Sequence, residues 1–285
     1  QDRTESDYQK AVTYDDKASY PYLYKYLGIT GSNYATYILD KVSILNPLGK
    51  VNGTTYHTTW QLAKDETYDL TVFGQAFRGI GSLYNATDNT GSTFRGNFDG
   101  QGSTVKYALE GLAMDYTVNS ALGTVFPACL RRSGLFNTIV GYQDASCYET
   151  DGFIIQNLNL KGTITAKGTP YYMLYAGGLV GYVSSAKMTL RKITVTEEQI
   201  DGGSWKGKNS TLHAAAGLIG YVDGNQNVTI TDCRVAGTKD KSVSITGTDC
   251  TAGMVGYVNL NASCTLKINN TGSDAAVEWL KLSSS

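Results

Sequence analysis

One short phrase occurs three times in the C-terminal half of the chain, and it limits the fold more than any other feature. The copies are GGLVGYV at Gly177–Val183, AGLIGYV at Ala216–Val222 and AGMVGYV at Ala252–Val258, and a shorter copy, SGLF, begins at Ser133. The glycines that open the copies fall at 134, 178, 217 and 253, at intervals of 44, 39 and 36 residues. Self-similarity at such a spacing predicts supersecondary units stacked in a line.

The segments between the copies also keep a constant order. After each apolar strand comes a polar turn and then a strand of alternating side chains, at Met188–Leu190, Val228–Ile230 and Cys264–Ile268. Alternation at period two is typical of a strand with one buried face. The remaining segments, 196–213 and 236–249, vary most, and in repeat proteins such segments form loops on one side, often the side that binds.

The residue types favour an all-β chain. Gly is abundant at 32 residues and Tyr at 21, whereas Pro occurs only 4 times. Many glycines among β-branched and small polar residues favour short strands joined by tight turns. We therefore expect a parallel β-helix. A β-propeller, whose blades have a similar repeat length, is the alternative, but no Trp-Asp signature recurs here.

Stacking the copies in register predicts two ladders of side chains. The residue after the first glycine should lie in the core, at Leu179, Leu218 and Met254. The aromatic residue of each copy should stack on its equivalent in the next, at Tyr182, Tyr221 and Tyr257. Such a ladder could be a platform for sugars, but repeats generate aromatic ladders whether or not anything binds, so we favour a structural role.

Charge and hydropathy exclude several classes of partner. The chain has 24 Lys and Arg against 25 Asp and Glu, a formal net charge of −1. This balance argues against binding to nucleic acid or to an anionic membrane. No run of about 18 apolar residues is present, so we expect no membrane insertion. The chain begins at Gln1 without a signal peptide, and we expect a fragment of a longer exported protein that is monomeric by itself.

The five cysteines divide into two groups. Aligning the repeats on their glycines places Cys264 opposite Val228 and Met188, and Cys233 opposite Ile193. Those positions are apolar, so both cysteines are predicted to be small core residues. The remaining three are Cys250, Cys129 and Cys147. The last two lie in an irregular insertion, and whether they form a disulfide stays open, because spacing alone does not fix pairing.

The chain divides into two regions. Residues 1–60 form a Tyr-rich cap or flanking region, with short helices such as Tyr34–Leu45 or a cap on the first coil as the alternatives. Residues 61–285 form the repeat region, with an insertion at about 110–152.

At these positions the chain resembles the bacterial surface proteins that carry GLUG repeats, named for a Gly-Leu-apolar-Gly core. FRGIG at Phe77–Gly81 and FRGNFDGQG at Phe94–Gly102 are similar to the opening motif of that family. IIQNLNLKGTI at Ile154–Ile164 is similar to its recurrent strand, and the repeated glycine phrases complete the ordered set. The resemblance covers about residues 65–271.

The resemblance implies a right-handed parallel β-helix on an exported bacterial protein. Similar segments occur in adhesin-like cell-wall proteins and in non-catalytic regions of metallopeptidases that cleave immunoglobulin A. Two features depart from the family pattern: the segment between Val105 and Asn157 is longer than usual, and the N-terminal 50 residues match nothing in it.

The sequence does not favour an enzyme. Polysaccharide-cleaving β-helices gather carboxylates on adjacent coils, whereas the acidic residues here share no repeat position. Asp99 lies in the turn sequence FDGQG and is predicted to be structural. The two histidines, His57 and His213, are far apart in sequence, and no HExxH motif is present. We expect no catalytic residue, no metal site and no cofactor.

The candidate partner-binding residues lie outside the repeated phrase. Trp205 stands in a polar, Gly-rich loop with Lys206 and Lys208, where an exposed ring would suit a protein or glycan contact; packing against the side of the helix is the alternative. A second candidate is the alternating set Tyr20, Tyr22, Tyr24 and Tyr26, which would share one face if extended. Packing on the first coil is the alternative there.

We therefore expect a non-catalytic, extracellular segment of a bacterial surface protein that binds a host glycoprotein, an immunoglobulin, a mucin or a glycan. A rigid stalk that holds another domain away from the cell wall is the first alternative. A polysaccharide-degrading enzyme is the second.

Overall fold

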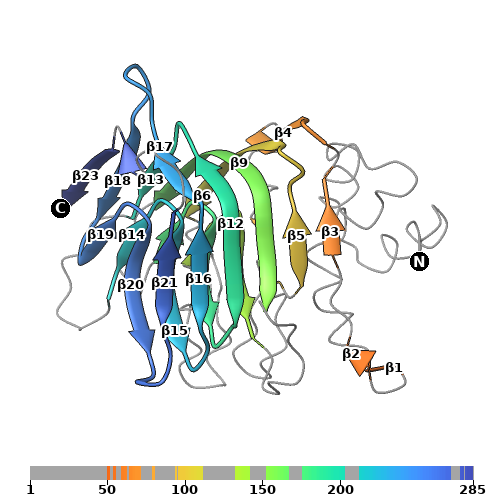
Figure 1. Ribbon diagram of the computed structural model, residues 1–285. Coiled ribbons are helices and arrows are strands. Elements are labelled where there is room, and N and C mark those ends of the chain that lie inside the picture. The colour runs from red at the N-terminus through yellow and green to blue at the C-terminus, as the bar shows by residue number, and fades with distance from the viewer. Residues whose placement is uncertain are drawn as a thin grey trace, which may run out of the picture.

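The strands of the protein wind into a parallel β-solenoid (Figure 1). The computed structural model describes residues 50–51, 54–55, 59–62, 64–71, 79–80, 94, 96–111, 132–141, 152–166, 175–202, 212–270, 277–278 and 280–284. Within these ranges the regular structure is strand, apart from a short 3-10 segment at 70–71, and no α-helix is present. The expected all-β parallel β-helix is confirmed and the propeller alternative is wrong. The Tyr-rich cap and the helix expected at Tyr34–Leu45 lie outside the described residues.

The strands follow one another in successive turns of the solenoid. A two-stranded antiparallel pair, β1 (Lys50–Val51) and β2 (Thr54–Thr55), precedes them. The turns are formed, in order, by β3 (Thr59–Gln61) and β4 (Thr67–Asp69); β5 (Asn97–Asp99) and β6 (Thr104–Gly111); β7 (Arg132–Ser133), β8 (Phe136–Val140) and β9 (Phe153–Ala166); β10 (Tyr175–Gly177), β11 (Val180–Ser184), β12 (Met188–Val195) and β13 (Gln199–Asp201); β14 (Ala214–Ala216), β15 (Ile219–Gly224), β16 (Val228–Thr231), β17 (Arg234–Ala236) and β18 (Val243–Gly247); and β19 (Cys250–Ala252), β20 (Val255–Leu260), β21 (Leu266–Asn269), β22 (Val277–Glu278) and β23 (Leu280–Ser284).

Equivalent strands stack in parallel to form the walls. One wall has the order β19-β14-β10-β7 and the next β20-β15-β11-β8, while the remaining strands form a large sheet that bends around the other sides. The repeated phrase supplies β11, β15 and β20, and Tyr182 pairs with Tyr221, which pairs with Tyr257. The short copy SGLF belongs to the same stack, because Phe136 on β8 pairs with Val180. The insertion expected at about 110–152 therefore contains one strand of each of these two walls, β7 and β8.

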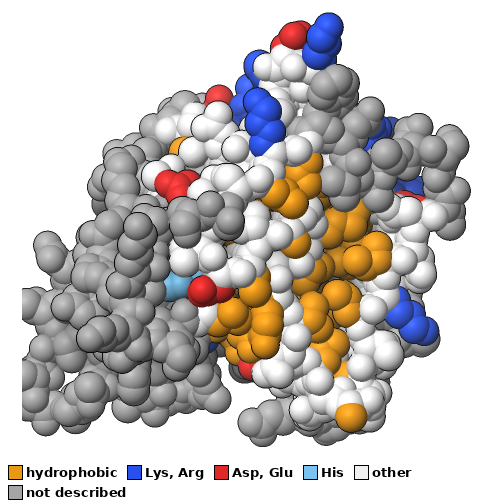
Figure 2. Space-filling view, turned by 90° about the vertical axis from the view of Figure 1, so that its left-hand side faces the viewer, with side chains coloured by type: hydrophobic (Ala, Val, Ile, Leu, Met, Phe, Trp, Pro, Cys, Tyr) orange, Lys and Arg blue, Asp and Glu red, His pale blue; other side chains and the backbone are white. Residues whose placement is uncertain are grey.

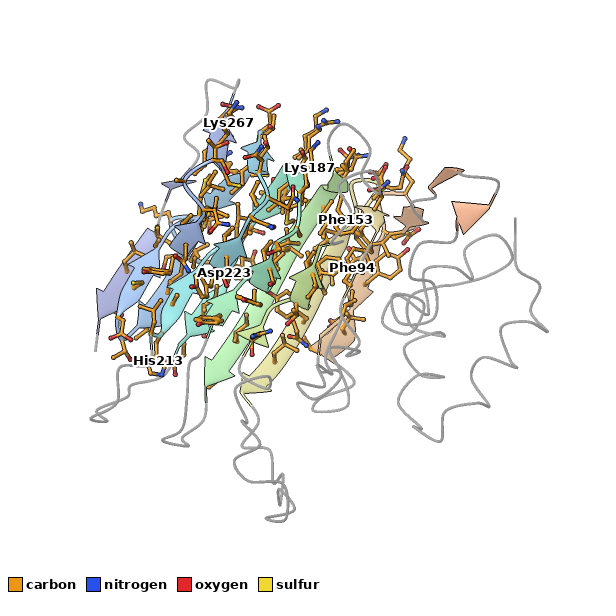
Figure 3. The ribbon with its side chains drawn as sticks, turned by 90° about the horizontal axis from the view of Figure 1, so that it is seen from below. Phe94, Phe153, Lys187, His213, Asp223 and Lys267 are labelled. Carbon is orange, nitrogen blue, oxygen red and sulfur yellow. The ribbon has the colours of Figure 1, made fainter. Side chains whose placement is uncertain are left out.

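The interior is a continuous apolar core. Leu179 and Leu218 are fully buried and Met254 is 8% exposed, so the predicted core ladder is confirmed. Near the N-terminal end the core is aromatic: the ring centroid of Phe136 lies 4.7 Å from that of Phe94 and 5.3 Å from that of Phe98. Phe94 and Phe153 point inward in Figure 3. Burial of this apolar surface is the main stabilising contribution to the fold.

The second glycine of the repeated phrase allows two walls to approach closely. A Cβ at Gly181 would lie 2.6 Å from the backbone N of Ser133, and one at Gly220 would lie 2.7 Å from the carbonyl oxygen of Gly181. Both distances are shorter than any side-chain contact tolerates, so glycine is required at these two positions near the start of β11 and β15. The close approach of neighbouring backbone therefore explains why the second glycine of the phrase recurs in each repeat.

A second bend divides the long strands of the large sheet. Asn157, Lys192 and Asp232 occupy equivalent positions there, and their φ angles are 54°, 52° and 52°. This left-handed conformation is uncommon outside glycine, and Asn and Asp tolerate it better than most residues.

The register corrects one cysteine prediction. Val222 pairs with Val258, but Val228 pairs with Leu266, so the turn after β20 is two residues longer than the turn after β15. The prediction that Cys264 faces Val228 in the core is therefore wrong: Cys264 lies in that turn and is partly exposed. Cys233 is buried, as predicted, and it occupies the position equivalent to Ile193 of the preceding turn. Cys129 and Cys147 lie outside the described residues.

Candidate functional site

The connections that vary most between repeats converge on one corner of the solenoid. The large sheet ends there at equivalent positions, since Thr165 pairs with Asp201, which pairs with Thr246. The next wall begins at equivalent positions too, because Tyr175 pairs with both Arg132 and Ala214. The segments that join these ends are 112–131, 167–174, 202–213 and 248–249. We call this place the loop corner.

The variable segments are shorter than the sequence predicts. The range 196–213 includes β13, and the range 236–249 includes β18. Both strands pair in register, because Ile200 pairs with Ile164 and with Ile245. Each range therefore contains a strand of the large sheet, followed by a connection, 202–213 or 248–249, that starts and ends at the loop corner.

The predicted partner-binding residues are not among those that the structure describes. Trp205, Lys206 and Lys208 belong to the segment between β13 and β14, so the described strands fix only where that segment leaves and returns, which is the loop corner. Tyr20, Tyr22, Tyr24 and Tyr26 precede the first described residue. Both sets stay predictions.

His213 and Asp249 connect two successive turns by hydrogen bonds at the loop corner. The backbone N–H of His213 donates to Oδ2 of Asp249 over 2.7 Å, and Nδ1 of the same imidazole lies 3.2 Å from that oxygen. His213 is buried, and Figure 3 places it on the side away from Lys187 and Lys267. The segment that carries Trp205 is thus anchored at its end to the short connection of the next turn.

The predicted tyrosine ladder forms a cluster separate from the core. Tyr182, Tyr221 and Tyr257 stack through three turns, with ring centroids 5.5 Å and 5.2 Å apart, and Tyr175, which the sequence did not single out, joins them. The guanidinium of Arg132 lies 3.9 Å from the ring centroid of Tyr182, a cation–π contact.

Two members of the tyrosine ladder, Tyr182 and Tyr221, are buried. The hydroxyl of Tyr182 donates to Oδ2 of Asp223 over 3.0 Å. Burial raises the pKa of Tyr182 to about 12, so the phenol stays protonated. Tyr182 and Tyr221 expose less than a tenth of their surface, and a sugar stacks only on an exposed ring, so burial makes these two residues structural, whereas Tyr257 is 38% exposed.

Asp99 is a structural carboxylate, as the sequence predicts. Its Oδ1 accepts from the backbone N–H of Gln101 and from the side-chain amide of Asn157, and its Oδ2 accepts from the amides of Gln101 and Gln156. Four donors around a buried carboxylate fix the bend between β5 and β6 to the next turn.

A second buried carboxyl group, that of Glu198, was missed by the sequence analysis. Glu198 is fully buried, and its Oε1 lies 2.9 Å from the hydroxyl oxygen of Tyr107. No other described atom lies within hydrogen-bonding distance of its Oε2. Burial raises the pKa of Glu198 to about 8, with the Tyr107 hydroxyl acting in the opposite direction to a smaller extent. In the register of the sheet Glu198 is equivalent to Gly162 and Val243, so no repeated acidic position marks it in the sequence.

The hydrogen count around Tyr107 also indicates a neutral Glu198. The Tyr107 hydroxyl contacts the carbonyl oxygen of Gly178 as well as Oε1 of Glu198. A phenol has one hydrogen, and a carbonyl oxygen only accepts. The Tyr107 hydroxyl donates its hydrogen to only one of these two oxygens. Both contacts are therefore hydrogen bonds only if the carboxyl group of Glu198 is protonated and donates to the Tyr107 oxygen. Since neither group reaches solvent, the pair stabilises the interior rather than a substrate.

No three of the described His, Cys, Asp and Glu side chains are placed to hold a metal ion together. Among the described residues no helix is long and apolar enough to cross a membrane.

The fold defines the class of protein: a parallel β-solenoid. Comparison of the chain with protein-family models, curated proteins and solved structures finds no match.

Proposed function

We propose that the protein is a non-catalytic, extracellular segment of a bacterial surface protein that binds a host glycoprotein, an immunoglobulin or a glycan through the loop corner. The observation that supports this most is that connections of very different length, 112–131, 167–174, 202–213 and 248–249, start and end on one edge of the stack. Insertions that vary from repeat to repeat on one side are typical of the binding face of a solenoid. The resemblance to GLUG-repeat proteins supports the bacterial surface.

The carboxyl groups of the described interior do not suggest a catalytic pair. Asp99 accepts four hydrogen bonds and Glu198 is enclosed by the core. A glycosidase needs two carboxyl groups that face the same substrate cleft. The non-catalytic proposal is consistent with this arrangement.

A capture experiment from host secretions tests the proposal. The protein is immobilised and compared with Trp205→Ala and with a variant in which residues 203–211 are replaced by a short Gly-Ser linker. Tyr257→Ala is the matched control, because Tyr257 is an exposed aromatic residue on β20 rather than in the variable connections. We expect a host protein or glycan to be enriched by the wild type and by the control and lost with the loop variants. No enrichment, or enrichment that survives loop replacement, would contradict the proposal.

The rigid-stalk alternative is favoured by a different observation. Parallel pairing continues without interruption from β3 to β5 and then to β9 and β12, and the later turns stack on these. Such a stack resists bending and suits a spacer. If the loop variants and the wild type both capture nothing, the stalk is the better proposal.

A further inference from the structure

The connection between β17 and β18 contains an insertion that the two preceding turns lack. Equivalent positions flank this bend in three successive turns: Leu160 and Thr163, Val195 and Gln199, and Val235 and Ser244. Residues 161–162 and 196–198 join the first two pairs, whereas residues 236–243 join the third. The longer connection projects beyond the neighbouring turns at the top of Figure 1, and Figure 2 shows basic and acidic side chains at its tip. We call residues 237–242 the projecting loop.

The projecting loop is exposed and is held mainly by bonds within itself. Thr238, Lys239, Asp240 and Lys241 are all exposed. The backbone N–H of Thr238 donates to the carbonyl oxygen of Lys241 over 2.8 Å, and the backbone N–H of Lys241 donates to Oγ1 of Thr238 over 3.0 Å. Nζ of Lys241 also lies 3.0 Å from Oε2 of Glu197 in the preceding turn. Opening the loop therefore breaks exposed hydrogen bonds and one surface ion pair, each of which stabilises the fold little.

Lys64 shows that exposure alone does not leave the backbone free. Its side chain is exposed as well, in the bend between β3 and β4. The residues that follow it are bonded to the next turn, because the N–H of Asp65 donates to the carbonyl oxygen of Gln101 over 3.1 Å and the N–H of Glu66 donates to Oγ of Ser103 over 2.8 Å. Proteases cleave segments that open locally, so backbone bonded to another turn resists them. Exposed loop tips without such bonds are preferred sites of cleavage.

We propose that the projecting loop is a processing site, at which an endoprotease specific for lysine hydrolyses the peptide bond between Lys239 and Asp240. Water is the second reactant: the C–N bond breaks, the carbonyl carbon of Lys239 becomes a carboxylate, and the nitrogen of Asp240 becomes an ammonium group. Lys239 is available to the specificity pocket of such a protease, because it makes no hydrogen bond or ion pair with a described residue, whereas Lys241 binds Glu197.

The sheets on both sides of the loop would hold the cleaved chain together. Before the loop, β17 pairs with β12; after it, β18 pairs with β13, where the buried Ile245 lies beside the buried Ile200. The product is therefore one folded body made of two chains. The loop precedes β18 and the loop corner follows it, so the processing site is independent of the binding function proposed above.

Limited digestion of the folded protein with trypsin tests the site, with new N-termini identified by mass spectrometry. Lys64–Asp65 is the matched bond, because both bonds join Lys to Asp and the preference of trypsin for the following residue is the same. We expect an N-terminus at Asp240 to form about tenfold faster than one at Asp65, and the two bonds to be cut at similar rates in short peptides that contain them. The two products should elute together in size exclusion and separate in urea.

Two variants check that the site is Lys239. Lys239→Gln should abolish the new N-terminus at Asp240, and Lys64→Gln should leave its rate of formation unchanged. Folded wild type that yields no N-terminus at Asp240, or that yields it no faster than the one at Asp65, would overturn the proposal. Products that separate without urea would overturn the two-chain body.

Discussion

The hydroxyl oxygen of Tyr107 lies 2.9 Å from Oε1 of Glu198, and both groups are buried in the solenoid interior. The two residues come from different turns, on β6 and just after β12. An ionised carboxylate in such a place would lose its hydration without a cation to compensate. The pair is stable because both groups stay neutral at neutral pH: burial raises the pKa of Glu198 to about 8 and that of Tyr107 well above its ordinary value.

Stability should therefore fall as the pH rises. In the unfolded chain Glu198 loses its proton near its ordinary pKa of 4.5, whereas the folded protein keeps the proton up to about pH 8. Between these values the folded state binds more protons, so the free energy of unfolding decreases by up to about 1.4 kcal/mol per pH unit, and the loss levels off above the folded pKa. Urea unfolding at a series of pH values measures this slope.

Glu198→Gln should remove that part of the slope, because the amide has the shape of the neutral acid and does not titrate. The variant should be more stable than the wild type near pH 8 and similar to it near pH 5. Glu197→Gln is the neighbouring control. Its carboxylate binds Lys161 and Lys241, which lower its pKa, so its contribution is present above the unfolded pKa and is lost on acidification. Parallel pH profiles for wild type and Glu198→Gln would contradict a buried neutral acid.

Removing the Tyr107 hydroxyl should destabilise the protein at all pH values. Tyr107→Phe leaves the Gly178 carbonyl and the Glu198 carboxyl without a partner in the interior, at a cost of about 1–3 kcal/mol. Tyr68→Phe is a control of the same chemistry in a different turn. Thermal unfolding measures both changes, and a Tyr107→Phe protein as stable as the wild type would show that water replaces the hydroxyl.

Gly178→Ala should be one of the most damaging small substitutions. A Cβ at Gly178 would lie 2.2 Å from Oε2 of Glu198 and 2.3 Å from the carbonyl oxygen of Gly217. The carboxyl could move, but the backbone of the next turn cannot, so we expect a loss of about 2–3 kcal/mol. At Gly202 the nearest atom to an added Cβ is 2.9 Å away. Gly202→Ala should therefore cost less, and equal losses in urea unfolding would show that the close approach at Gly178 is unimportant.

The sequence predicts the parts of this fold that repeat and misses the parts that occur once. The stack of Leu179, Leu218 and Met254 follows from a phrase that recurs in register. Strand β13, Gln199–Asp201, was counted as loop because three residues carry too little periodicity to be recognised. Glu198 was missed for a related reason: its burial depends on Tyr107, 91 residues earlier, and on a glycine that leaves room for it. The location of the loop corner required the register of both sheets, which spacing alone did not provide.

The corrected position of Cys264 leads to a labelling experiment. Glycine spacing placed it in the core, but the turn after β20 has two extra residues, which bring Leu266 into that position and leave Cys264 in the turn. A soluble thiol reagent should therefore modify Cys264 in the folded protein. Cys233 should react only after unfolding, because it is buried and burial raises the pKa of its thiol to about 11. Peptide mapping by mass spectrometry after brief labelling distinguishes the two thiols and serves as its own control. Protection of Cys264 in the native protein would restore the original alignment, whereas rapid modification of Cys233 would place it outside the core.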